Sequence, residues 1–73
     1  MLEYKVLDRI IIGDKTVVIV YGNPDRFSVG KVVKDTKGET YKIESVVSPC
    51  ENIEGIMTNL LLQGKFKDVS FVF

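Results

Sequence analysis

The chain has 73 residues, 45% of them hydrophobic, with ten Lys plus Arg balanced by ten Asp plus Glu. This length predicts one small domain, residues 1–73, and the composition is that of a globular protein rather than a disordered one. A net charge of zero argues against tight nucleic-acid binding, because neutralising phosphates supplies most of that affinity.

A single cysteine, Cys50, excludes an intramolecular disulfide, which a secreted domain of this size normally needs. The first residues lack the apolar stretch and cleavage site of a signal peptide. No run approaches the ~20 apolar residues that cross a bilayer. We therefore expect a cytoplasmic protein without membrane association.

The first predicted strand covers residues 3–12. Its apolar side chains recur at every second position, which is typical of a strand with one buried face. A charged residue, Asp8, falls on that face and indicates a bulge midway along the strand. The residues expected to share the apolar face are Tyr4, Val6, Ile10 and Ile12.

Gly13 and Asp14 are expected to form a tight hairpin turn, because a glycine at the first turn position suits turns that match the strand twist. A second strand then covers residues 16–21 and is apolar on both faces. One face carries Val18 and Val20. The other carries Val17, Ile19 and Tyr21.

The remainder of the chain predicts four more strands, over residues 31–35, 39–47, 60–63 and 69–73. Gly38 is expected to supply a positive φ between the first two of these. Tyr41, Ile43 and Ser45 alternate along one face of the long strand, and Val69, Phe71 and Phe73 share one face of the last. Residues 48–59 are expected to be irregular, with a helical turn at their start. Six short strands without a long helix predict a closed all-β barrel, since closure removes exposed edges.

Catalytic residue types are scarce. The absence of histidine excludes Ser-His and Cys-His pairs, and one cysteine without histidine excludes the usual zinc clusters. The carboxylates alternate with lysines, as on solvated strand faces, and no glycine-rich phosphate loop is present. We expect no enzyme, and no cofactor, metal or nucleotide site.

Three short motifs follow one another along the chain. The first is TVV at residues 16–18, followed by Gly22; the second is FSVGKVV at residues 27–33. The third is EG at residues 54–55, followed after an interval by LLQG at 61–64. Their order and spacing resemble the second, β-barrel domain of translational GTPases such as elongation factor Tu.

The resemblance extends over about residues 8–67 and implies a six-stranded Greek-key barrel. Nothing in these residues corresponds to the GTPase domain, so the resemblance implies no nucleotide hydrolysis. Family members tend to carry cations after the fourth strand, where this chain reads SVVS at residues 45–48, and Gln63 stands where the family has Arg. Both departures remove cations where an RNA ligand would need them, and so they argue against the tRNA-binding role of the family.

Residues 29–38 and Tyr41 are also similar to a second relative, the small barrel protein of archaeal box H/ACA pseudouridylation particles. The Pro-Tyr element of that protein is missing before Val46, and the protein is usually more basic than this chain. This resemblance ranks below the first.

Two candidate surfaces follow. The outer residues of the second strand (Val17, Ile19 and Tyr21), with Arg26 nearby, predict docking of a protein partner or of a second copy, since monomers seldom expose large apolar areas. The alternative is that residues 48–59 cover this apolar face, so that no partner docks on it. The other candidate is RNA binding, as in tRNA or ribonucleoprotein recognition, through phosphate contacts from a set of lysines. These are Lys31, Lys34, Lys42 and Lys65, and Lys37 and Lys67 are expected to lie near them in the fold; a solvated strand face is the alternative.

Overall fold

The computed structural model describes residues 2–22, 26–47, 51–52 and 55–73, with the backbone alone at residues 51, 52, 55 and 56. The regular structure in these ranges consists of β-strands. The strands are β1 (Glu3–Ile12), β2 (Lys15–Tyr21), β3 (Val32–Asp35), β4 (Thr40–Val47), β5 (Glu51–Asn52), β6 (Gly55–Gln63) and β7 (Ser70–Val72).

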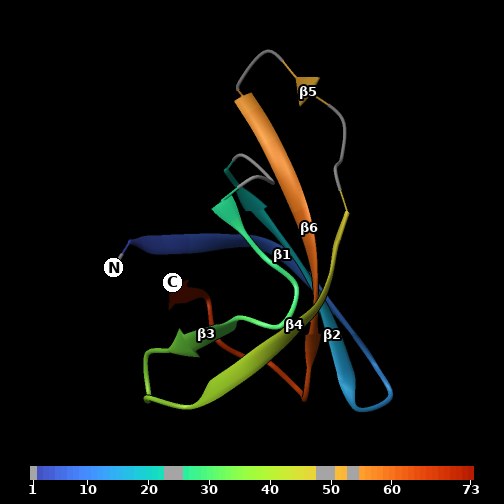
Figure 1. The fold of residues 1–73 in the computed structure, drawn as a ribbon, viewed down its shortest axis with the longest axis vertical. Helices are drawn as coiled ribbons and strands as arrows, with labels where there is room; N and C mark the ends of the chain where they lie inside the picture. The colour runs from blue at the N-terminus through green and yellow to red at the C-terminus, as the bar shows by residue number, and fades with distance from the viewer. Residues whose placement is uncertain (1, 23–25, 48–50, 53–54) are drawn as a thin grey trace.

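Six of these strands close into an antiparallel barrel, as predicted (Figure 1). Neighbours around the ring run β1, β2, β6, β4, β3 and β7, and β7 returns to β1. The order β3, β4, β6 with β2 beside β6 is a Greek key. The short β5 pairs with the start of β6 and lies beyond the ring.

The barrel interior holds one apolar cluster with an aromatic centre. Phe71 of β7 is almost fully buried, and its ring centroid lies 5.7 Å from that of Tyr4, 6.4 Å from that of Phe27 and 6.0 Å from that of Phe66. Offset and edge-on ring contacts at such distances stabilise a core beyond simple area burial. Strand β2 contributes Val18 and Val20, both fully buried, as predicted.

The predicted bulge in β1 is confirmed, because the register with β2 shifts between Val6 and Asp8. Its consequence for the following residues was not expected. Ile10 and Ile12 are 55% and 60% exposed, so the prediction that they share the face of Tyr4 and Val6 is wrong. One inserted residue reverses which face of the sheet each later side chain occupies.

A similar irregularity occurs in β4, where the register with β6 shifts between Ile43 and Ser45. Ile43 is fully buried, but Ser45 lies opposite Leu61 and Val46 packs against the core instead. The predicted sharing of one face by Tyr41, Ile43 and Ser45 therefore fails at Ser45.

Two boundaries also differ from expectation. Strand β6 begins at Gly55 instead of residue 60, so residues 55–59 are regular. Of the predicted helical turn at residues 48–51, the first three residues lie outside the described residues, and Glu51 belongs to strand β5. Residues 57–59 pair with residues 19–21 of β2. At the other end of the chain, Val69 precedes β7 and is 64% exposed rather than sharing a buried face with Phe71.

Two fully buried threonines lie at the two ends of the β2–β6 pairing. The Thr16 hydroxyl accepts a hydrogen bond from the Phe66 N–H at 2.9 Å and donates one to the Gly64 carbonyl at 2.8 Å. The Thr58 hydroxyl donates to the Gly22 carbonyl at 2.6 Å. These bonds satisfy backbone groups at the points where the chain leaves each strand.

We expect Thr16→Val to lower the free energy of unfolding by about 2–4 kcal/mol, because it leaves two buried backbone groups unsatisfied. Thr16→Ser keeps the hydroxyl and loses one methyl group, which costs roughly 1 kcal/mol. Urea unfolding followed by circular dichroism measures both. Equal losses for the two variants would contradict the role assigned to the hydroxyl.

Candidate functional site

The outer surface of β1, β2 and β6 carries a continuous apolar face. The strand register places Ile10 beside Val17, and Val17 beside Leu61. Tyr21 lies beside Met57 at one end of the two central strands. We define the outer apolar face as Ile10, Ile12, Val17, Ile19, Tyr21, Val47, Met57 and Leu61.

Few charged or polar side chains interrupt this face: Asp8 of β1 and Asn59 of β6 lie on either side of Ile19. Between Lys15 and Tyr21, the outward positions of β2 and of its partner β6 carry no charge. At one margin, the Lys15 ammonium lies 2.9 Å from the Glu44 carboxylate. This hydrogen bond and the attraction between the charges raise the pKa of Lys15 and lower the pKa of Glu44. The pair is exposed and contributes little to stability.

The structure brings three of the four predicted docking residues together. Val17 and Ile19 are half-buried and Tyr21 is 41% exposed, all on the outer apolar face. Arg26 lies beyond the end of β2 and is exposed. The next residue, Phe27, turns into the core, with its ring centroid 5.0 Å from that of Tyr4.

The four predicted RNA-binding lysines do not form one patch. Lys34 pairs with Thr40, and Lys42 pairs with Val32, so Lys34 and Lys42 share the outer face of the β3–β4 hairpin. Lys31 precedes β3 and is exposed. Lys65 belongs to a different place, the segment that joins β6 to β7.

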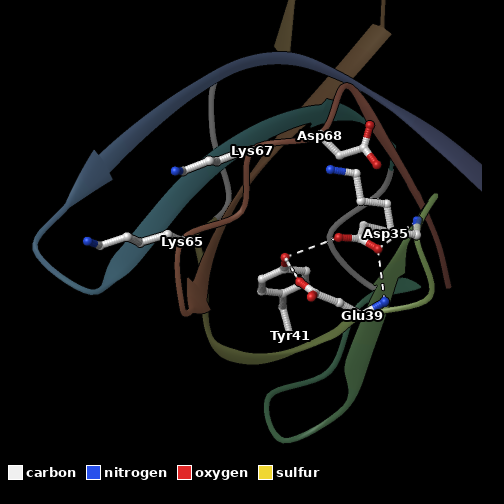
Figure 2. Close-up of a pocket in the computed structure, with 7 residues that line it drawn as sticks. Asp35, Glu39, Tyr41, Lys65, Lys67 and Asp68 are labelled. Atoms are coloured by element: carbon white, nitrogen blue, oxygen red, sulfur yellow. Dashed lines mark hydrogen bonds between the residues drawn. The ribbon is translucent and has the colours of Figure 1, made fainter.

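A cavity of about 350 Å³ opens between the β3–β4 turn and the segment joining β6 to β7 (Figure 2). In Figure 2 the side chains of Lys65 and Lys67 extend side by side, away from the carboxylates of Asp35 and Glu39. The lining residues, which we call the turn pocket, are Asp35, Lys37, Glu39, Tyr41, Lys65, Lys67 and Asp68.

Tyr41 and Asp35 build one wall of the turn pocket. The Tyr41 hydroxyl lies 3.1 Å from a carboxylate oxygen of Asp35 and 3.1 Å from one of Glu39. Desolvation, followed by hydrogen bonding to these carboxylates, raises the pKa of Tyr41 to about 12. Tyr41 is therefore a neutral donor at physiological pH. The other Asp35 oxygen accepts the backbone N–H groups of Lys37 and Glu39, both at 2.9 Å.

Asp68 ties the opposite wall to the β3–β4 turn. Its carboxylate accepts the Thr36 hydroxyl, the Thr36 backbone N–H at 2.9 Å and the Val69 backbone N–H at 2.8 Å. The bonds from Thr36, first the hydroxyl and then the backbone N–H, lower the pKa of Asp68. Asp68 thus holds together two segments that are distant in the chain.

The carboxylates of Asp35 and Asp68 accept several hydrogen bonds within the turn pocket, whereas its lysines have no ion-pair partner in the described part of the chain. Lys37, Lys65 and Lys67 form no ion pair with any residue that the structure describes. Sequence reasoning expected Lys37 to lie near Lys65 and Lys67 in a local basic patch, but it missed the turn pocket itself. The signal that would have located one wall is Asp35 before Thr-Lys-Gly, because an aspartate often binds the backbone of the turn that follows it.

Two other kinds of site are absent from the described ranges. There, no three acidic or cysteine side chains are grouped so as to hold a metal ion. No helix in that part of the chain is long and apolar enough to cross a bilayer.

The lowered pKa of Asp68 predicts an acid-sensitive fold. A folded-state pKa below the ordinary value of 3.8 gives stability that is present above that value and lost as pH falls through the folded-state pKa. We expect Thr36→Val, which removes the hydroxyl donor, to raise the pKa of Asp68 and to weaken the dependence of stability on acid. NMR titration of the Asp68 carboxyl carbon checks the first, and urea unfolding between about pH 5 and pH 2 checks the second. An unchanged pKa of Asp68 would contradict the assignment of the Thr36 hydroxyl as its main cause.

Comparison of the chain with protein-family models, with curated protein sequences and with solved structures gave no significant match. The resemblance to the barrel domain of translational GTPases therefore stays a prediction.

Proposed function

We propose that this barrel is a non-enzymatic interaction module that docks a protein surface, on a partner or on a second copy, through the outer apolar face. The observation that carries the proposal is the contiguous run of uncharged, mostly apolar outward side chains on β2 and β6, extended by Ile10 and Ile12 of β1. We propose the cytoplasm as its location, since the single cysteine suits a reducing compartment.

The exposure of the face supports docking. Ile10 and Ile12 of β1 and Val47 of β4 are each more than half exposed, on two strands of the same barrel. Large contiguous apolar areas are uncommon on monomers and mark interaction surfaces. A stable interface buries about 800 Å² on each partner. That is about a sixth of the 4683 Å² surface of this chain, so one barrel face is large enough.

The resemblance to translational GTPases supports the same reading, because the second domains of that family pack against neighbouring domains. The alternative function, RNA binding through Lys31, Lys34, Lys42 and Lys65, has less support. These lysines are divided between the β3–β4 hairpin and the turn pocket, so they offer no single track for a phosphate backbone.

We expect Ile19→Asp to abolish docking, because it places an uncompensated charge at the centre of a surface that must be desolvated. Sedimentation equilibrium of the chain alone measures self-association, and quantitative affinity capture measures binding of other proteins. Ile10→Asp is a second variant at a more exposed position, chosen because it carries less risk to the fold.

Val32→Asp is the matched control. Val32 is 51% exposed on the outer side of the β3–β4 hairpin, away from the outer apolar face, so the same substitution there should leave docking intact. The proposal fails if the wild type is strictly monomeric and no protein distinguishes Val32→Asp from the two variants of the outer apolar face.

A further inference from the structure

We propose that the turn pocket binds the terminal phosphate group of a small molecule through Lys65 and Lys67, whose side chains extend side by side (Figure 2). Lys37 lines the same pocket from the β3–β4 turn and adds a third positive charge, so the pocket joins two segments that the fold brings together. This site is independent of the outer apolar face.

The unequal use of hydrogen-bonding groups in the turn pocket favours an anion. Asp35 accepts two backbone N–H groups and the Tyr41 hydroxyl, and Asp68 accepts two backbone N–H groups and the Thr36 hydroxyl. Both carboxylates are thereby occupied in building the walls. The ammonium groups, by contrast, retain donors for a ligand, since each carries three and none has an ion-pair partner among the described residues.

Glu39 is the exception among the carboxylates. Glu39 is exposed, and only one of its two carboxylate oxygens lies within hydrogen-bond distance of the Tyr41 hydroxyl, which also contacts Asp35. Its charge would oppose an anion in the pocket. The lining residues carry three cations and three carboxylates, so their formal sum is zero and binding is expected to be weak and sensitive to salt.

Size and charge select the ligand class. A volume of about 350 Å³ lies at the lower end of small-molecule pockets, which are roughly 300–1,000 Å³. A terminal phosphate has close to two negative charges and three acceptor oxygens, which the two neighbouring ammonium groups of Lys65 and Lys67 can share. An RNA backbone carries one charge per phosphate and needs a linear track of cations. The neighbouring lysines Lys34 and Lys42 would have to supply that track, and neither lines the pocket.

The experiment is an NMR titration of the full chain with inorganic phosphate at low ionic strength and about pH 8, where phosphate is mostly dianionic. We expect saturable shifts of backbone amides in the β3–β4 turn and at residues 64–69. Lys65→Gln combined with Lys67→Gln should weaken binding about tenfold. Glu39→Gln should strengthen it about two- to fivefold, because it removes the opposing charge.

Lys34→Gln combined with Lys42→Gln is the matched control, since it removes the same charge from outside the pocket. It should leave phosphate binding within about twofold of the wild type. Ile19→Asp should also leave phosphate binding unchanged, which separates this proposal from docking by the outer apolar face.

Three results would overturn the proposal. One is the absence of saturable shifts with phosphate. Another is an equal loss of affinity in the two lysine pairs, which indicates general charge attraction. The third is tighter binding of a single-stranded RNA octamer without terminal phosphates, weakened by the Lys34 and Lys42 substitutions, which indicates RNA binding instead.

Discussion

The ladder between β2 and β6 joins strands from opposite halves of the chain, pairing each residue from Lys15 to Tyr21 with one from Gln63 back to Met57. Without this ladder β2 and β6 would be the free edges of an open sheet, and such edges invite pairing with other chains. The buried hydroxyls of Thr16 and Thr58 secure backbone groups at its two ends. Closure of the barrel, the position of the aromatic core and the continuity of the outer apolar face all depend on this pairing.

Two bulges decide which side chains face the solvent. In β1 the shift after Val6 turns Ile10 and Ile12 outward, and in β4 the shift after Ile43 turns Val46 inward and Ser45 outward. A strand with a continuous register would have directed the isoleucines of β1 into the barrel. The same irregularities that bend the strands around the ring therefore also build the apolar surface that we propose for docking.

The two proposed surfaces differ in their physical basis. The outer apolar face arises from cross-strand register and carries little charge, with Asp8 beside Ile19 and the Lys15–Glu44 pair at one margin. The turn pocket arises from loops, and its carboxylates hold those loops in place while its lysines remain unpaired among the described residues. The two proposals therefore assign a protein partner and a small anion to different surfaces of the barrel.

Local patterns in the sequence were sufficient to predict the closed all-β barrel, the bounds of β1 and nearly all of β2. They also predicted the turns at Gly13 and Gly38, whose φ angles are +62° and +87°. These features depend on the alternation of neighbouring side chains and on the steric freedom of single glycines. The outward positions of Ile10 and Ile12, the strand residues before Leu60 and the pocket between the β3–β4 turn and the segment after β6 were decided only by the tertiary structure. Each of these features depends on a segment that is distant in the chain, either through the register against another strand or through the proximity of a loop. A pattern of adjacent residues encodes neither the register nor the proximity.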